Sequence, residues 1–248
     1  MLELRSVGYR YPGYRRPALE GIDLSLRDGE VVGLVGANEA GKSTLCLVAA
    51  GLAPASVGGE LTGEVRIDGA GIRGLRPHEI AGRVGIVFSS SSSQLSGITG
   101  TVFEEVALGS VNLGLPVAVT VARARAALEA LAIANLAERR PDHLSGGQAQ
   151  LVAIASMLAM GPRNLVLDEP TAELDAEGRD LVGQTLRGLA RTGTTVLIAE
   201  HDLDLLASIC SRLVAIDGGR IAFDRPIAEG LTDARLVGLG VARAAVPA

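Results

Sequence analysis

The chain has 248 residues, a formal net charge of −5 at pH 7 and only 2% aromatic residues. This length suits one large α/β domain with an inserted subdomain, which can bury a substantial core. The acidic balance and the scarcity of aromatic rings exclude the basic, ring-lined surfaces with which proteins usually bind nucleic acids. We therefore expect no nucleic-acid partner.

The hydrophobic content of 48% does not by itself indicate a membrane protein. The longest apolar run, residues 151–160, is interrupted by Ser156, whereas a spanning helix takes roughly 20 apolar residues. Residues 1–5 show no signal segment. Cys46 and Cys210 lie far apart without metal-ligand spacing, so we expect reduced core residues. The pattern indicates a cytosolic protein or one docked to a membrane partner.

The first elements predicted along the chain are strands. Residues 2–7 and 22–27 alternate between apolar and polar side chains, as half-exposed strands do. Asp28-Gly29 marks a turn into residues 30–35, which read as a buried strand, and residues 63–68 form a further predicted strand. We expect a small antiparallel sheet that leans on a parallel core.

The loop predicted between the first two strands holds Tyr9, Tyr11 and Tyr14, which are all the tyrosines of the chain. An aromatic ring before a nucleotide-binding loop can stack on adenine without reading the edge of the base. The alternative is that these tyrosines are ordinary surface or packing residues.

Residues 36–44 read G-x-x-x-x-G-K-[ST] and follow the apolar run 31–35. This pattern is typical of a phosphate-binding loop, in which backbone N–H groups wrap the phosphates, the lysine neutralises their oxygens and the next hydroxyl ligates magnesium. Lys42 is the single lysine among 23 basic residues. The alternative is a tight connection before a helix. The predicted phosphate loop consists of Gly36, Ala37, Asn38, Glu39, Ala40, Gly41, Lys42, Ser43 and Thr44.

A further buried strand is predicted at residues 84–88, and it runs directly into the serine run, residues 89–93. Five serines are too few to separate domains, so we interpret the run as a hinge between a core and an inserted lobe. Residues 101–108 then predict a helix with acids in its first turn, and residues 119–137 predict an amphipathic helical stretch.

The segment Leu144-Ser145-Gly146-Gly147-Gln148, called here the signature segment, precedes an apolar helical run over residues 149–160. Ser145 is well placed to cap this helix, and the two glycines permit close approach of the backbone to an anion. By itself, such a turn is most often only a cap.

Two carboxylates end the apolar run at residues 164–167. Because ligands bind at the carboxyl ends of parallel strands, this position predicts that Asp168 and Glu169 lie beside the phosphate loop. Asp168 can then hold magnesium, and Glu169 can deprotonate a water for attack on the γ-phosphate. The alternative, two exposed acids, fits poorly with the buried character of the preceding residues.

A second strand of the same design covers residues 194–199 and ends at His201. A histidine at a strand end beside a nucleotide can donate a hydrogen bond to the γ-phosphate. Residues 212–221 read as a hairpin around the turn at residues 217–219.

Together, the phosphate loop, the signature segment, the block Asp168-Glu169-Pro170-Thr171, Leu174-Asp175 and His201 resemble the ATP-binding cassette (ABC) transporter ATPases. The resemblance covers residues 1–225. It implies an α/β fold, a P-loop NTPase core with an antiparallel β subdomain and an inserted α-helical subdomain over about residues 89–160. Residues 226–248 are expected to form a short C-terminal extension.

The resemblance assigns roles to matching positions and implies ATP and Mg²⁺ as ligands. Tyr11 would stack on adenine, Lys42 and its loop would hold the phosphates, and Ser43 and Asp168 would serve magnesium. Glu169 would be the general base and His201 the switch, so the implied catalytic residues are Lys42, Glu169 and His201.

The resemblance also implies that two chains close head-to-tail over two nucleotides. Ser145, Gly146, Gly147 and Gln148 would then face ATP bound to the opposite subunit, which is either a second copy or a paralogue. Asp175 would lie at the seam between the two subunits.

A narrower resemblance comes from residues 93–97, 102–109 and 199–202. They look like the ATPase subunits of energy-coupling factor importers, which serve vitamins and transition-metal ions. This implies an integral membrane partner and a place on the cytoplasmic face of the cell membrane.

Two positions depart from the family pattern. Ser89 stands where members usually carry a glutamine that reaches magnesium and the attacking water, and Glu39 stands where many carry glycine. A mainly nucleotide-binding regulatory partner is therefore an alternative function, as is the ATPase of another ABC transporter class. An ABC-type ATPase of chromosome maintenance lacks support, because no heptad-bearing insertion is present.

Overall fold

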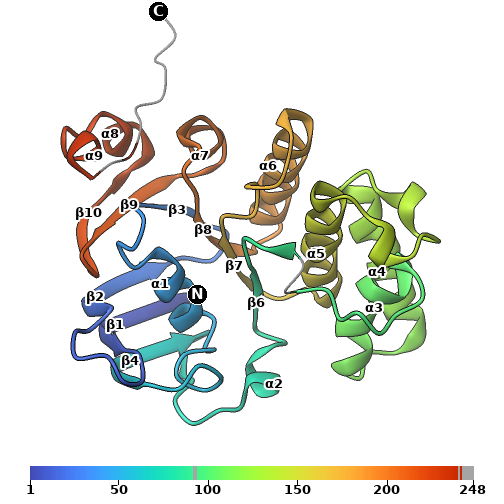
Figure 1. Cartoon of the computed structure of the whole chain (residues 1–248), viewed down its shortest axis with the longest axis horizontal. Coiled ribbons are helices and arrows are strands. Elements are labelled where there is room, and N and C mark those ends of the chain that lie inside the picture. The colour runs from blue at the N-terminus through green and yellow to red at the C-terminus, as the bar shows by residue number, and fades with distance from the viewer. Residues whose placement is uncertain (92–93, 240, 242–248) are drawn as a thin grey trace, which may run out of the picture.

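The computed structural model describes residues 1–91, 94–239 and 241. Ser92 and Ser93 of the serine run and residues 240 and 242–248 of the predicted C-terminal extension lie outside the described residues. Within the described part, the strands form two sheets that meet over one helix, and a separate group of helices stands at one side (Figure 1).

The first sheet is antiparallel and four-stranded in the described residues, with the order β2-β1-β4-β5. Alternating burial along β1 and β2 puts one face of this sheet against the interior and leaves the other to solvent, as the alternating sequence predicts. Its strands are β1 (Leu2–Arg10), β2 (Leu19–Leu26), β4 (Glu60–Ile67) and β5 (Ala70–Gly71).

The second sheet has the order β10-β9-β3-β8-β7-β6 in the described residues, and its five strands from β9 to β6 run parallel. Every residue of β3, β7 and β8 is buried, which agrees with their nearly continuous apolar sequences. The strands are β3 (Val31–Val35), β6 (Val84–Val87), β7 (Asn164–Asp168), β8 (Thr195–Ala199), β9 (Arg212–Asp217) and β10 (Arg220–Pro226).

Helix α1 (Lys42–Ala49) lies between the two sheets, since it contacts β1 of the first and both β7 and β8 of the second. The side of the second sheet that faces away from α1 is covered by α6 (Ala176–Arg191) and α7 (Leu203–Ile209), whose buried residues share a core cluster with Val196 and Ile198 of β8. The remaining helices are α2 (Pro77–Ile80), α3 (Val102–Asn112), α4 (Val117–Ala130), α5 (Gly146–Met160), α6 (Ala176–Arg191), α7 (Leu203–Ile209), α8 (Ile227–Thr232) and α9 (Arg235–Gly238).

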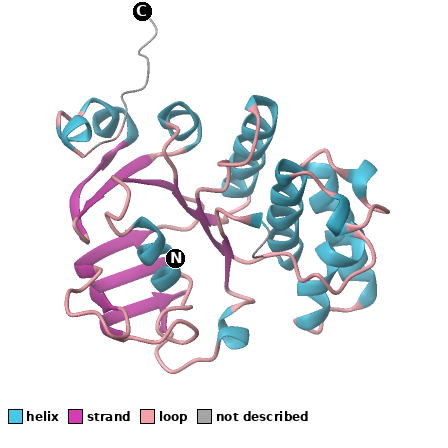
Figure 2. Cartoon of the chain, in the orientation of Figure 1, coloured by secondary structure: helices cyan, strands magenta, loops and turns pink. Residues whose placement is uncertain are grey.

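The helices α3, α4 and α5, called here the helical lobe, pack on one another beside the edge strand β6. Figure 2 shows that this lobe contains helices and loops, whereas the strands gather in the other part of the molecule. The lobe begins after the serine run and ends where the chain enters β7. Its position therefore places the signature segment at the side of the parallel sheet.

The α/β fold class is confirmed, but several element boundaries differ from those predicted. Tyr9 is not a loop residue, because β1 continues to Arg10 through pairs with β4, and the Tyr9 hydroxyl donates to the carbonyl of Gly58 at 2.6 Å. The predicted amphipathic stretch 119–137 is α-helical only to Ala130, because Ala132 adopts a left-handed φ of +50° that breaks the helix, and a short 3₁₀ helix (Ala134–Leu136) follows.

The cysteine prediction is confirmed, since Cys46 and Cys210 are both free and buried. Burial raises the pKa of each thiol above its ordinary value, which keeps both protonated at neutral pH. Within the described residues, no helix combines the length and the apolar character that crossing a bilayer takes.

Candidate functional site

The phosphate loop connects β3 to α1 at the carboxyl edge of the parallel sheet. Both glycines of the loop are required by the backbone itself. A Cβ on Gly36 would lie 2.4 Å from the carbonyl oxygen of Ile216, and Gly41 has a φ of +111°. Glu39, by contrast, holds a left-handed φ of +64° with a side chain, which is a strained conformation for this residue type.

Lys42 is folded back over the loop that precedes it. Its Nζ donates to the carbonyl oxygens of Gly36 at 3.0 Å and Ala37 at 3.2 Å, and the residue is only 5% exposed. Its Nζ also lies 3.9 Å from Oε1 of Glu169. The ammonium group is thus held at the mouth of a curved loop whose backbone N–H groups suit an anion.

Asp168 is the last residue of β7 and is aligned with Ala199 of β8. Burial raises the pKa of the Asp168 carboxyl, and the hydrogen bond from the Ser43 hydroxyl opposes that rise only in part. The Oδ1 atom of Asp168 is buried and has no hydrogen-bond partner among the described residues.

An orphaned buried carboxylate oxygen beside a serine hydroxyl is a good fit for a hard divalent cation. Mg²⁺ binds few protein oxygens and keeps several water or phosphate ligands. The donor set of Ser43 and Asp168 therefore fits a magnesium ion that is shared with a nucleotide.

Glu169 follows Asp168 at the strand end and has a φ of +51°, a strained value for a residue with a side chain. Its Oε1 lies 2.9 Å from Nε2 of His201, so one carboxylate oxygen faces both that imidazole and the Lys42 ammonium group. The sheet therefore brings together Lys42, Glu169 and His201, which the sequence predicts as catalytic residues from three separate segments.

Two polar residues that hold the site together were not predicted from the sequence. Glu200 is buried, and its Oε1 accepts from the N–H of Thr171 at 3.0 Å and from the Thr171 hydroxyl at 2.6 Å. Its Oε2 accepts from the N–H of His201 at 3.1 Å. Glu200 thus ties the loop after β7 to the loop after β8. The available signal was an acid directly after a buried strand.

Gln150 is the second missed residue. It is fully buried, and its Nε2 donates to the carbonyl oxygens of Phe88 and Pro170, both at 3.1 Å. It therefore joins α5 to the ends of β6 and β7. A lone glutamine in the apolar helical run 149–160 was the only hint in the sequence.

The prediction that Ser145 caps α5 is confirmed. Its hydroxyl accepts from the N–H of Gln148 at 3.3 Å, and the Gln148 side chain accepts from the N–H of Ser145 at 3.2 Å. Helix α5 lies on the opposite side of β6 and β7 from α1 (Figure 1). The signature segment is therefore not part of the cluster formed by Lys42, Glu169 and His201.

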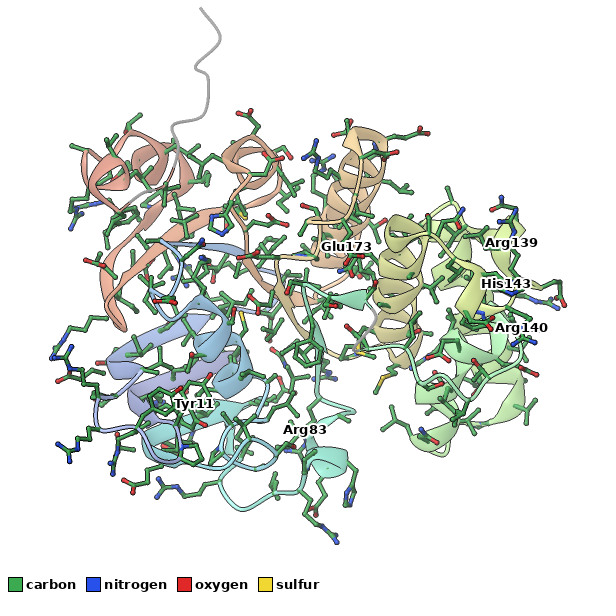
Figure 3. The ribbon with its side chains drawn as sticks, viewed as in Figure 1. Tyr11, Arg83, Arg139, Arg140, His143 and Glu173 are labelled. Atoms are coloured by element: carbon green, nitrogen blue, oxygen red, sulfur yellow. The ribbon has the colours of Figure 1, made fainter. Side chains whose placement is uncertain are left out.

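Tyr11 is half-buried beside the start of α1, and its hydroxyl lies 3.1 Å from Oγ1 of Thr44 (Figure 3). The ring packs edge-on against Tyr9, with centroids 4.9 Å apart, and near Tyr14 at 6.2 Å. This arrangement fixes a ring next to the phosphate loop. Ser89 is exposed just beyond β6, while the Gln94 amide is bonded to the backbone of Ile86 and Phe88.

The arrangement is that of an ATP-binding cassette, a class of P-loop ATPase. It combines a phosphate loop, an acidic pair at the end of β7, a histidine after β8 and a helical lobe with a glycine turn. Residues 19–172 match the model of the ABC transporter family. The chain therefore belongs to the ABC transporter family and is an ATP-hydrolysing subunit of such a transporter.

Similar proteins support this assignment. The energy-coupling factor transporter ATP-binding protein EcfA of Methanothermobacter thermautotrophicus is 40% identical over 240 residues, which are 96% of this chain and 74% of that protein. A putative ABC transporter ATP-binding protein of Pyrococcus abyssi is 39% identical over 225 residues, 90% of this chain and 80% of that protein.

Solved structures agree in fold. CbiO1 of Clostridium perfringens, described as part of the ABC transporter complex CbiONQ, has a TM-score of 0.80 at 30% identity and covers 96% of this chain and 92% of its own. The dimeric cassette MJ0796 bound to ADP and Pi has a TM-score of 0.80 at 27% identity, covering 92% and 99%. The resemblance to ABC ATPases, including those of energy-coupling factor type, is thus confirmed.

Proposed function

We propose that this chain powers an importer of the energy-coupling factor type, for vitamins or transition-metal ions. It would work on the cytoplasmic face of the cell membrane, as one of two ATPase subunits bound to an integral membrane partner. The names of its relatives support this, since EcfA proteins of two archaea, Methanothermobacter thermautotrophicus and Methanosphaera stadtmanae, are 40% and 38% identical to it.

The observation that carries the hydrolytic role is the convergence of Lys42, Asp168, Glu169 and His201 at one edge of the sheet. Lys42 and the backbone of residues 36–44 would hold the ATP phosphates, and Tyr11 would stack on the adenine. Mg²⁺, when bound by Ser43 and Asp168, supplies positive charge to the phosphate oxygens.

Glu169 would act as the general base. Its carboxylate accepts the proton of the attacking water as the water oxygen forms a bond to the γ-phosphorus and ADP leaves. The 2.9 Å contact of Glu169 Oε1 with Nε2 of His201 means that both side chains would face the same γ-phosphate. His201 would then donate to the γ-phosphate as the switch residue.

Each signature segment would complete the site of the other subunit. The first N–H groups of α5 and the positive end of its dipole suit a γ-phosphate, yet they lie away from the phosphate loop of their own chain. A head-to-tail dimer with a second copy or a paralogue would bring the signature segment of one chain to the phosphate loop of the other. Asp175 would lie at the seam of this dimer. The dimeric MJ0796 cassette supports such a pair.

The test is magnesium-dependent ATP turnover by the chain in complex with its membrane subunit. We expect turnover with the natural sequence and its near-complete loss in Glu169→Gln, which keeps the shape of the side chain but removes the base. Absence of turnover in the complex, or an unchanged rate in Glu169→Gln, contradicts the proposal.

A second candidate function, a nucleotide-binding partner with weak hydrolysis, is favoured by one observation. Ser89 cannot supply the amide that family members place after the phenylalanine that follows β6. Under this hypothesis, Ser89→Gln raises ATP turnover severalfold. A turnover rate that does not change in Ser89→Gln counts against it.

A further inference from the structure

Three segments that are distant in the sequence meet where the helical lobe joins the parallel sheet. They are the end of β6 with the serine run, the loop after β7, and the start of α5. Gln150 joins them from the helix, because its Nε2 donates to both Phe88 and Pro170. This buried junction fixes the helical lobe to the parallel sheet.

Glu173 bridges the same segments from the loop after β7 (Figure 3). Its Oε2 accepts from the hydroxyl of Ser91 at 3.0 Å, and Ser91 is only 3% exposed. The same oxygen lies against the start of α5, since a Cβ on Gly146 would stand 3.1 Å from it. A Cβ on Gly147 would stand 3.1 Å from the Glu173 carbonyl oxygen. One side chain thus contacts the serine run and the signature segment together.

The loop that carries Glu173 is firmly attached to the catalytic edge of the sheet. Thr171, two residues earlier, gives both its N–H and its hydroxyl to the buried Glu200 carboxylate, which also accepts from the N–H of His201. Hydrogen bonds to Glu200 therefore join the backbone of His201 to Thr171, the main chain continues from Thr171 to Glu173, and the Glu173 side chain accepts from Ser91.

We propose that Glu173 is a positioning residue for ATP hydrolysis. Through Ser91, its carboxylate sets the orientation in which the helical lobe presents Ser145–Gln148 to the nucleotide of the second subunit, and it does so without touching nucleotide itself. The inference rests on the proposed function, in which the signature segment acts across the dimer.

The chemistry of the contact explains why this bond is the adjustable one. Gln150 and Glu200 are buried, so breaking their bonds leaves unpaired polar atoms. The Glu173 side chain is exposed, so water can replace Ser91 at its carboxylate. Breaking the Ser91–Glu173 bond leaves only the buried Ser91 hydroxyl without a partner, so closure of the dimer can change this bond at lower cost than either buried junction.

The test compares steady-state ATP hydrolysis by four variants of the transporter complex. We expect kcat to fall about tenfold in Ser91→Ala and in Glu173→Ala, the effect of losing one hydrogen bond to a charged group, with KM for ATP unchanged. Glu173→Gln keeps an acceptor oxygen at the same reach and should retain most of the turnover. The double variant Ser91→Ala/Glu173→Ala should be no slower than either single variant.

The matched control is Ser96→Ala. Ser96 also donates its hydroxyl to a carboxylate, Oε2 of Glu105 at 2.6 Å, but that bond joins the segment before α3 to α3 itself and does not reach the loop after β7. Ser96→Ala should lower stability and leave kcat unchanged. Equal losses of kcat in Ser96→Ala and Ser91→Ala overturn the inference, as do additive losses in the double variant.

A second measurement separates this inference from the proposed function. In the isolated chain, Ser91→Ala should speed amide hydrogen exchange both near Ser91 and at the start of α5, whereas Ser96→Ala should not. Faster exchange at both places without ATP turnover in any complex supports the contact and rejects the hydrolytic function. If the natural complex hydrolyses ATP but Ser91→Ala changes neither amide exchange nor kcat, the role of Glu173 is rejected and the proposed function stands.

Discussion

Lys42 reaches the mouth of its loop because two carbonyl oxygens, those of Gly36 and Ala37, hold the ammonium group there. We predict that Lys42→Ala weakens ATP binding at least tenfold, since it removes the only side-chain cation of the phosphate loop and with it a charge-assisted contact. Titration calorimetry measures this directly. An unchanged affinity in a variant with a native melting curve would refute the assignment.

Glu39 brings a carboxylate and a strained backbone into a loop that is built for anions. We predict that Glu39→Gly raises ATP affinity severalfold, because it removes a negative charge from the phosphate loop. It should also raise the stability of the unbound chain by about 1 kcal/mol, the cost of a left-handed residue. Glu39→Gln removes only the charge and so separates the two effects. The prediction fails if neither variant binds ATP more tightly than the natural chain.

Single residues could be predicted where chemistry is concentrated in a short motif. Lys42, Asp168, Glu169 and His201 were all identified in that way, and the structure places them together. Residues that bridge distant segments could not be predicted, because their hydrogen-bond partners are remote in the sequence. Ser91 and Glu173 are 82 positions apart, and Glu200 and Thr171 are 29 positions apart. No local pattern encodes such pairs.

At the scale of elements, α3 and α5 begin with the same device. Thr101 and Glu104 form a capping box on α3, as Ser145 and Gln148 do on α5. We predict that Thr101→Ala and Ser145→Ala each lower the free energy of unfolding by about 1 kcal/mol. Urea denaturation measures both.

The two caps should differ in function. Thr101→Ala serves as the structural control and should leave ATP turnover unchanged, whereas Ser145→Ala should also slow turnover in the complex because its hydroxyl lies in the signature segment. Equal effects of the two variants on turnover would contradict a role for Ser145 beyond capping.

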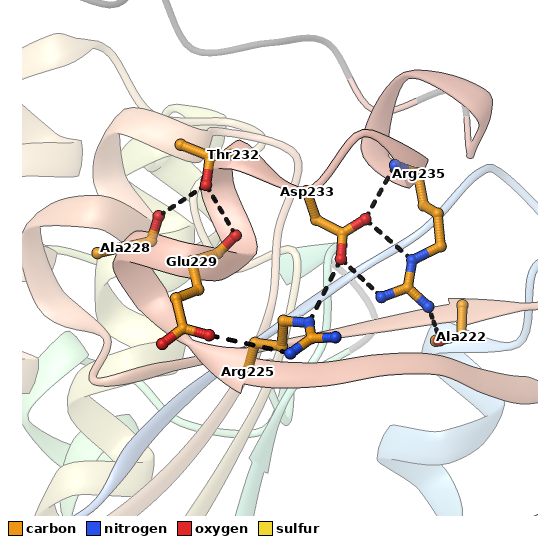
Figure 4. A network of polar contacts seen from close by, with 7 residues as sticks. All are labelled: Ala222, Arg225, Ala228, Glu229, Thr232, Asp233 and Arg235. Carbon is orange, nitrogen blue, oxygen red and sulfur yellow. Dashed lines mark hydrogen bonds and ion pairs between the residues drawn. The ribbon is translucent and has the colours of Figure 1, made fainter.

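The elements β10, α8 and α9 are joined by an ion-pair network (Figure 4). Asp233 accepts from the N–H, Nε and Nη2 of Arg235 at 3.0, 2.9 and 2.6 Å, and Arg225 lies 3.5 Å away on β10. Arg235 also donates to the carbonyl of Ala222 at 2.7 Å. The Arg235 guanidinium holds the pKa of the Asp233 carboxyl well below its usual range.

This pKa direction predicts how stability depends on pH. The contribution of Asp233 is fully present above the pKa of an unfolded aspartate, about 3.9, and is lost as the pH falls below that value toward the lower pKa of the folded state. Asp233→Asn should therefore lower the melting temperature slightly at pH 7. The difference between the two proteins should shrink below about pH 4. A difference that stays constant from pH 7 to pH 3 would exclude this cause.

Element types were predicted well where the burial pattern was simple, as in β3, β7 and β8. Boundaries were predicted less well where a partner decides them. Tyr9 belongs to β1 only because β4 continues alongside it, and α4 ends early because of the backbone at Ala132. Neither cause can be read from the residues of the element itself.

At the scale of the whole molecule, the signature segment lies on the other side of the sheet from α1 and is not part of the cluster of Lys42, Glu169 and His201, so the proposed activity requires association of two chains. We predict that Glu169→Gln binds ATP normally and forms a stable closed dimer, because only the base is lost. Size-exclusion chromatography with and without ATP measures this. Monomers under both conditions would contradict the head-to-tail arrangement.

The overall architecture could be predicted only in outline. The motifs indicated a parallel core, an antiparallel sheet and an inserted helical part, but not the order β10-β9-β3-β8-β7-β6. Strand order depends on contacts between segments far apart in the chain, such as β3 with β8, and these contacts have no sequence period. The site could be predicted more fully than the fold because each of its motifs is a short local pattern, whereas the strand order is not.

The seclusion of Lys42 also makes this chain a convenient object for chemical footprinting. The sequence contains no other lysine, and this one is nearly inaccessible, so a lysine-specific protease has a single target position and an amine-acylating reagent has only one besides the α-amino group of Met1. Modification of Lys42 reports the local opening of the phosphate loop, and protection of Lys42 by added ATP reports that nucleotide occupies the loop. Neither signal has to be separated from a background of surface amines on other lysines.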